Sequence, residues 1–162
     1  IDINNNFVIN KLAYACMIKS HGSELKDDDY EFIRTLVKRG YSVTNPNVNC
    51  KELLWYLFSG KKHEDVNFSL LVFYIVHWIY NEAPHRSSEP TDKEIAEFKE
   101  IIEIVAPTAD FNIVYGRCGT IIEIISKHIE RPYISRVDAN GGVYFANKQI
   151  FVIDYLRELG AH

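Results

Sequence analysis

The chain has 162 residues, enough for one domain with a substantial buried core, so we expect residues 1–162 to form a single domain. Its formal net charge of -4 at pH 7 argues against a nucleic-acid backbone or an anionic membrane as the main partner. Cys16, Cys50 and Cys118 are far apart and have no CxxC spacing, which argues against a disulfide framework and a zinc site and favours a reducing compartment.

Two helices are predicted in the first quarter of the chain. Apolar residues recur at helical spacing from about Asn6 to Ser20, and Gly22 offers a stop. A second helix is predicted from about Asp29 to Arg39. Aspartates at its start and basic residues at its end suit the helix dipole, and Gly40 follows. The next segment, SVTNPNVN, contains Pro46 and three asparagines, which favour a loop or a single turn.

A third helix is predicted from Cys50 to Phe58, with Asn49 as its cap. The apolar run that follows, Val66–Tyr80, contains no charged residue. It is too short to span a bilayer comfortably, since that takes roughly 18 or more apolar residues, and it exceeds the usual strand length of about 4 to 8. We therefore expect a buried central helix, with His77 as a core histidine satisfied by a hydrogen bond.

Two capping boxes predict helices in the second half of the chain. One is Thr91–Glu94, before a helix that Pro107 ends, and the other is Thr120–Glu123, before a helix that Pro132 ends. The first of these helices carries an acidic stripe opposite an apolar face, which predicts a solvated outer surface rather than a metal or acid–base site. The stripe is Glu94, Glu97, Glu100 and Glu103, and the apolar face is Ile95, Phe98, Ile102 and Val105.

The segment around Asn140 leaves two structures open. Asn140, Gly141 and Gly142 lie between two apolar segments, a pattern typical of a β-hairpin. A helix stop followed by two short helices, ending with FVIDYLREL, fits equally well. Periodicity alone does not decide between them.

Motifs for catalysis and metal binding are absent from the sequence. There is no GxxxxGK[ST], GxSxG or HExxH, and no GxGxxG after a strand. The six histidines are scattered without ligand spacing. One Gly–Arg pair beside Tyr115 is very weak evidence for a phosphate-binding turn. We therefore expect neither an enzyme nor a metal or cofactor site.

Four short motifs, in order along most of the chain, resemble those of the B-cell lymphoma two (Bcl) family of apoptosis regulators. FVINKLAYACMIKSHG is similar to the family's N-terminal motif, an amphipathic helix with a central Tyr and a final Gly. Leu36–Gly40 has the LxxxG spacing of its death motif, the third homology motif. LFSG followed by VNFSLLVFYIV resembles the groove motif that leads into the family's central helix. VDANGGVYF resembles the second homology motif.

The chain also departs from the family pattern. Phe68 stands for the usual Trp of the groove motif, Ser69 for Gly and Leu70 for Arg. In the family that arginine pairs with the Asp of an incoming death-motif helix, and Leu70 cannot form this ion pair. Tyr41 replaces the Asp that usually follows LxxxG. The insert KKHED and the helix at 91–106 are additional.

The resemblance implies an all-α, Bcl-like helical bundle wrapped around the central helix. It implies a pro-survival regulator, without a cofactor, that binds amphipathic death-motif (BH-three) helices of pro-apoptotic relatives in a hydrophobic groove. Such a protein would be cytoplasmic or at the mitochondrial outer membrane, with membrane association through a tail not present in this sequence. Asn67 would offer the groove a side-chain hydrogen bond. The implied groove residues are Val43, Leu53, Leu54, Leu57, Asn67, Leu70, Val72 and Phe73.

Each apolar residue of this groove set, taken singly, is more often a core residue of a helical bundle.

Two other functions also stay open. A pore-forming killer of the same family would insert its core helices into the mitochondrial outer membrane, which the apolar run at 66–80 allows. A winged-helix nucleic-acid binder would use the turn at 138–144 as its wing; the acidic charge argues against it, and strand pairing across Asn140 would favour it.

Overall fold

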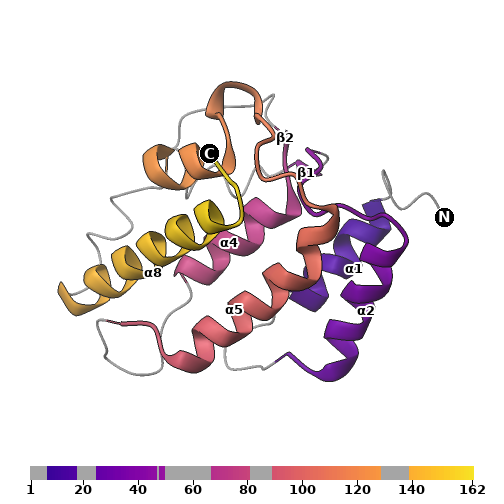
Figure 1. Ribbon diagram of the computed structural model, residues 1–162, viewed down its shortest axis with the longest axis horizontal. Coiled ribbons are helices and arrows are strands. Elements are labelled where there is room, and N and C mark those ends of the chain that lie inside the picture. The colour runs from indigo at the N-terminus through magenta and orange to yellow at the C-terminus, as the bar shows by residue number, and fades with distance from the viewer. Residues whose placement is uncertain (1–6, 18–24, 47, 50–66, 81–88, 129–138) are drawn as a thin grey trace.

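The computed structural model describes residues 7–17, 25–46, 48–49, 67–80, 89–128 and 139–162. In these residues the chain is helical apart from loops and one pair of two-residue strands, which confirms the all-α class. In the view of Figure 1, helix α4 lies between α8 and α5, and α1 and α2 lie together near the N-terminus. The predicted helix at 50–58 lies outside the described residues.

The first two predicted helices are confirmed as α1 (Phe7–Met17) and α2 (Asp27–Lys38). The start of α2 is closed by Asp29, whose Oδ2 accepts a hydrogen bond from the Lys26 backbone N–H at 2.9 Å. Its acidic first turn suits the positive end of the helix dipole. Tyr30, Ile33 and Leu36 form its buried face.

Helix α2 ends in a Schellman motif. Gly40 has a φ of 91°, and its N–H donates to the Val37 carbonyl at 2.9 Å. The Tyr41 N–H donates to the Leu36 carbonyl at 3.0 Å, and both of these side chains are buried, as the motif favours. The LxxxG spacing of Leu36–Gly40 is thus a complete helix-stop signal.

The central helix α4 spans Leu70–Tyr80, so the prediction of helix from Val66 is wrong at residues 67–69. Asn67–Phe68 forms strand β2, which pairs antiparallel with β1 (Val48–Asn49). Ser69 begins the helix, because its Oγ accepts a hydrogen bond from the Val72 N–H at 3.3 Å. The prediction of a loop at 42–49 therefore missed β1, and the hydroxyl of Ser69 within an apolar run was the overlooked start signal.

The prediction that α4 is buried is confirmed. Its described side chains are buried except for Phe73, which is half-buried, and His77, which is exposed. The helix packs against α1 and α8. The prediction of a core histidine is wrong, because positions 73 and 77 are one helical turn apart and share the least covered side of α4.

Helix α5 (Asp92–Val105) confirms the first capping box. Thr91 Oγ1 accepts a hydrogen bond from the Glu94 N–H at 3.2 Å, and the Thr91 N–H donates to Glu94 Oε1 at 3.3 Å. Pro107 lies in the short helix η1 (Ala106–Thr108) that follows. The buried side chains of α5 are Phe98, Ile101, Ile102 and Val105.

Phe98 is the centre of an aromatic cluster that joins three helices. Its ring lies 5.8 Å from Tyr74 and 4.6 Å from Trp78, both on α4, measured between ring centroids. It also lies 5.9 Å from Phe151 and 6.1 Å from Tyr155, both on α8 (Ala139–Glu158). The core of the described structure is therefore built where α4, α5 and α8 meet.

The second capping box is also confirmed. After η2 (Gly116–Cys118), Thr120 caps α6 (Ile121–Glu123), which continues as a π-helical turn, η3 (Ile124–His128). The predicted stop at Pro132 lies outside the described residues.

Helix α8 is one helix of 20 residues that includes Asn140, Gly141 and Gly142. Both structures left open for this segment are therefore wrong: there is neither a hairpin nor a pair of short helices. The glycines lie in the first turn, and the buried residues Phe145, Val152, Tyr155 and Leu156 recur at helical spacing farther on. Packing of this face outweighs the low helix propensity of the first turn.

Helix α8 also ends in a Schellman motif on an LxxxG sequence. Gly160 has a φ of 96°, and its N–H donates to the Arg157 carbonyl at 3.0 Å. The Ala161 N–H donates to the Leu156 carbonyl at 3.0 Å. The same spacing thus performs the same local task twice in this chain.

Candidate functional site

The described part of the predicted groove set divides into buried and accessible residues. Val43, Leu70 and Val72 belong to the core, with 1%, 2% and 1% of their surface exposed. Phe73 is half-buried and Asn67 is exposed. The other three, Leu53, Leu54 and Leu57, lie outside the described residues.

The accessible part of α4 is flanked by an aromatic side chain of α1. Tyr14, which is 41% exposed, meets Phe73 edge to face, with ring centroids 5.9 Å apart. His77 is the next residue on the same side of α4, and partial burial and the charge of Lys148 lower its pKa. Phe73 is thus the described groove residue that combines an apolar side chain with exposed surface.

A segment that we call the brace, residues 108–115, is hydrogen-bonded to the loop at 41–44, which carries Val43 of the predicted set. Thr108 Oγ1 donates a hydrogen bond to the Tyr41 carbonyl at 2.6 Å. The Asp110 N–H donates to Thr44 Oγ1 at 2.8 Å. The Tyr115 hydroxyl donates to the Thr44 carbonyl, also at 2.6 Å. Burial raises the pKa of Tyr115 to about 12, so this hydroxyl remains a donor at neutral pH.

This geometry gives Tyr115 a structural role. The residue is 2% exposed, and its hydroxyl is hydrogen-bonded to the loop at 41–44 and also contacts the Ser69 side chain at the start of α4. Gly116 adopts a φ of 54°, a left-handed backbone conformation that glycine adopts more readily than other residues. The shape of the turn therefore accounts for a glycine at this position. The suggestion of a phosphate-binding turn at this position thus has a simpler explanation.

A buried lysine lies at the junction of α4, α5 and α8. Lys148 is 1% exposed, and its Nζ donates to the Trp78 carbonyl at 2.6 Å and lies 3.3 Å from Glu94 Oε2. The ammonium also lies 4.4 Å from the centroid of the Trp78 ring. Burial lowers the pKa of Lys148 to about 8, against the opposing effect of Glu94.

Lys148 was not among the residues singled out in the sequence, and Glu94 was predicted to lie on a solvated stripe. That prediction is wrong for Glu94, which is partly buried and paired, and for Glu97, which is also half-buried, whereas Glu100 and Glu103 are exposed as predicted. A signal was present, because Lys148 lies at helical spacing between Phe145 and Val152 on the buried face of α8.

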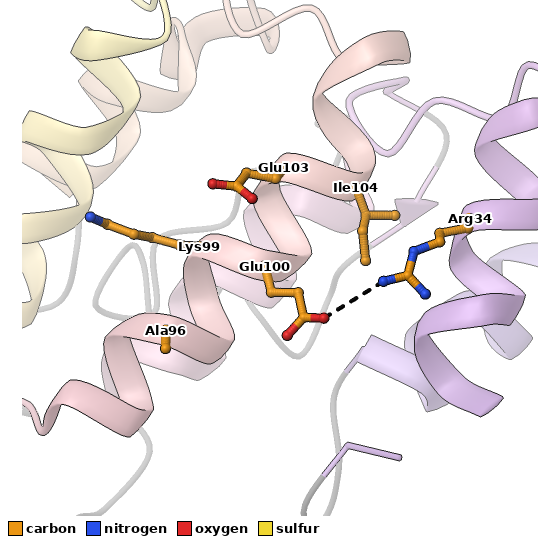
Figure 2. Close-up of a pocket in the computed structure, with 6 residues that line it drawn as sticks. All are labelled: Arg34, Ala96, Lys99, Glu100, Glu103 and Ile104. Atoms are coloured by element: carbon orange, nitrogen blue, oxygen red, sulfur yellow. Dashed lines mark ion pairs between the residues drawn. The ribbon is translucent and has the colours of Figure 1, made fainter. Parts of the chain in front are cut away.

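An open depression of about 620 Å³ lies along the outer side of α5, facing α2. Figure 2 shows Arg34 of α2 reaching toward Glu100 of α5, with 3.6 Å between their charged atoms. Lys99 points to the other side, where its Nζ lies 5.3 Å from the centroid of the Tyr155 ring. Two cations and two carboxylates balance in this lining, so it selects neither sign of charge. The lining residues are Arg34, Ala96, Lys99, Glu100, Glu103 and Ile104.

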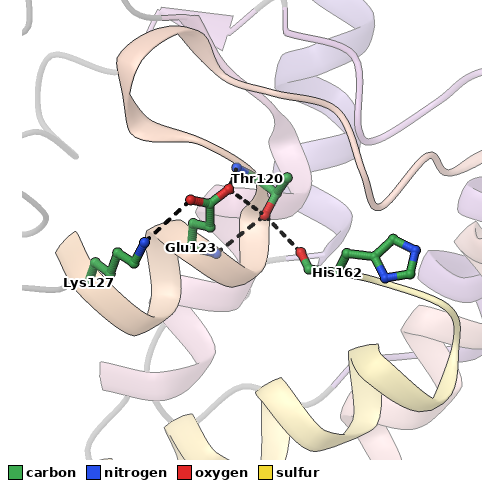
Figure 3. Close-up of polar contacts among 4 residues, drawn as sticks. All are labelled: Thr120, Glu123, Lys127 and His162. Carbon is green, nitrogen blue, oxygen red and sulfur yellow. Dashed lines mark hydrogen bonds and ion pairs between the residues drawn. The ribbon is translucent and has the colours of Figure 1, made fainter.

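The last residues of the chain are fastened to the start of α6 (Figure 3). Thr120 Oγ1 donates to the His162 carbonyl at 2.9 Å, while the His162 N–H donates to Asn112 Oδ1 at 2.8 Å. Hydrogen bonds from the Thr120 backbone and from Lys127 lower the pKa of Glu123. These polar contacts serve as a helix cap and a tether.

No protein-family model, characterised protein or solved structure matches this chain. Among the described residues, no group of His, Cys, Asp and Glu side chains could hold a metal ion. Likewise, none of the described helices is long and apolar enough to cross a membrane. The case for a function therefore rests on the motifs of the sequence and on the arrangement of the helices.

Proposed function

We propose that this protein is a pro-survival apoptosis regulator of the Bcl type, which binds an amphipathic death-motif helix of a pro-apoptotic relative in an apolar surface groove. The observation that carries the proposal is α4, a charge-free helix buried among amphipathic helices. It directly follows the groove-motif residues Asn67 and Phe68. A buried central helix preceded by this motif is what the Bcl resemblance implies.

Within the proposed groove, Phe73 and Asn67 are the described residues that a ligand helix can reach. Leu70 is buried in the core, so a ligand Asp would remain in solvent instead of entering an ion pair at this position. Affinity then depends on apolar burial, about 25 cal/mol per Å² before the costs of association are subtracted. The expected ligand presents apolar anchors at helical spacing.

The test is calorimetric titration with a panel of death-motif peptides of about 25 residues. We expect a dissociation constant of about 1 µM or lower, equivalent to about 8 kcal/mol. Phe73→Glu should abolish the binding, because it places a charge where the apolar face docks.

The matched control is Ile150→Glu, at a position on α8 that is 57% exposed, and it should keep the wild-type affinity. Circular dichroism of both variants verifies that they remain folded. Failure of the wild-type protein to bind any peptide of the panel would contradict the proposal.

The winged-helix and pore-forming alternatives remain to be compared with this proposal. The winged-helix alternative needs a wing near Asn140, and residues 139–158 form a helix instead. The pore-forming alternative is tested by dye release from liposomes with the lipid composition of the mitochondrial outer membrane. Release at protein concentrations that also bind peptide would favour a killer over a pro-survival protein.

A further inference from the structure

We infer that the brace, residues 108–115, is an autoinhibitory strap that closes the Val43–Leu70 end of the proposed groove. This inference rests on the proposed function. If the protein has that function, a death-motif helix can bind the Phe73 side of the groove while the strap is closed. It reaches the Val43 side only when the strap has opened.

The first step is the attachment of the strap to the loop at 41–44. Three contacts join them, and each uses a side-chain hydroxyl: those of Thr108, Thr44 and Tyr115. Thr44 receives two of the three, one on its hydroxyl and one on its carbonyl, and only 1% of it is exposed. The strap can thus be loosened by removing single hydroxyl groups.

The second step connects this loop to the start of the central helix. The Leu71 N–H donates to the Val43 carbonyl at 2.9 Å, across the join between the loop and α4. The Tyr115 ring also lies 6.4 Å from the Phe68 ring, measured between centroids. Strap, loop and the first turn of α4 therefore form one packed unit, in which Val43 and Leu70 are inaccessible.

The third step concerns the hinges of the strap. It runs from the last residue of the short helix η1 to the residue before the short helix η2, instead of lying within a long helix. On its C-terminal side, Gly116 and Gly119 have φ values of 54° and 86°, which glycine tolerates at low cost. The Tyr115 N–H closes this turn by donating to the Gly119 carbonyl at 2.8 Å. Besides its polar contacts, the strap is held by the buried side chains of Phe111 and Tyr115, so opening is a local unfolding that withdraws these two rings from the core.

The consequence is a measurable reduction of affinity. When only a fraction of the molecules has an open strap, the apparent dissociation constant is the intrinsic one divided by that fraction. Losing the Tyr115 hydrogen bond should raise the open fraction by about tenfold. Peptide affinity should rise by about the same factor.

The experiment compares the wild-type protein with Tyr115→Phe, and with Thr108→Val as a second route if the first variant fails to fold. Hydrogen exchange of the Leu71 amide reports the state of the strap without a ligand, and titration with death-motif peptides reports affinity. Tyr74→Phe is the matched control, because it removes a buried tyrosine hydroxyl outside the strap.

We expect about tenfold faster exchange at Leu71 and about tenfold tighter peptide binding in the strap variants, with neither change in Tyr74→Phe. If the wild-type protein binds peptide but the strap variants show unchanged exchange at Leu71 or unchanged affinity, the strap is contradicted. The proposed function is then unaffected. Absence of binding in every variant overturns both.

Discussion

At the scale of single residues, Tyr74 and Lys148 place polar atoms in the core with different outcomes. The Lys148 ammonium meets a carbonyl, a carboxylate and an aromatic ring. The Tyr74 hydroxyl is buried and finds no hydrogen-bond partner among the described residues. Burial raises the pKa of this hydroxyl well above its ordinary value, so it remains neutral at physiological pH.

Tyr74→Phe should therefore stabilise the protein. It removes an unpaired buried hydroxyl while retaining the ring that stacks on Phe98, and the expected gain in the free energy of unfolding is about 1 kcal/mol. Urea denaturation followed by circular dichroism measures it. A loss of stability would mean that the hydroxyl is hydrogen-bonded in solution.

The buried Lys148 should make the free energy of unfolding depend on pH in the alkaline range. Its pKa is about 8 in the folded protein, below its ordinary value of about 10.4, so the unfolded chain binds more protons between these values. Lys148 should consequently add roughly 2 kcal/mol to the free energy of unfolding between pH 8 and pH 10. Above pH 10 the free energy of unfolding should fall again, because burial raises the pKa of Tyr30, Tyr41 and Tyr115 to about 12.

Lys148→Met provides the comparison for this prediction. Methionine fills a similar volume without a titrating group, so the rise between pH 8 and pH 10 should disappear while the fall above pH 10 remains. Urea denaturation of both proteins at several pH values is the measurement. An equal rise in the two proteins would assign the effect to another group.

At the scale of helices and strands, short-range signals predicted the boundaries well. The capping boxes at Thr91 and Thr120 and the stop at Gly40 involve residues within a few positions of each other, so they form the same contacts in most surroundings. The strand pair was missed because Val48 and Phe68 lie far apart in the sequence. The α8 segment was also misjudged, since the Asn-Gly-Gly sequence suits a turn locally but a long buried face follows it.

Substitution at the two helix stops tests the Schellman motifs. Gly40→Ala and Gly160→Ala force alanine into left-handed backbone, at φ values of 91° and 96°. Each should lower the free energy of unfolding by about 1–2 kcal/mol. An added Cβ meets no atom within 4 Å at either position, so the cost is conformational and not steric. Thermal denaturation gives the values, and unchanged stability would rule out the left-handed conformation.

At the scale of the whole molecule, one aromatic cluster holds the described helices together. Because Phe98 contacts rings of both α4 and α8, Phe98→Ala should cost about 3–5 kcal/mol. That is a large share of the typical 5–15 kcal/mol for a domain. Leu12→Ala, at a position that is 47% exposed, should change stability by no more than about 0.5 kcal/mol.

Urea denaturation with two probes measures this effect. Circular dichroism follows the helices, and the fluorescence of Trp78, measured in proteins that carry Trp55→Phe, follows the surroundings of the cluster. If the three helices share one core, the two transitions coincide and shift together in Phe98→Ala. A loss of fluorescence signal at lower urea than the loss of helix would indicate that the cluster is separate from the helical core.

The sequence by itself determined that the protein is helical, where several helices begin and end, and that α4 is buried, because these properties follow from periodicity, capping residues and the absence of charge. Only the tertiary structure decided which side chains of α4 face outward and that the brace is hydrogen-bonded to the loop that carries Val43. It also decided that Lys148 pairs with Glu94. A leucine or valine at helical spacing suits a core and a groove equally, and which one it lines depends on neighbours that come from distant parts of the chain.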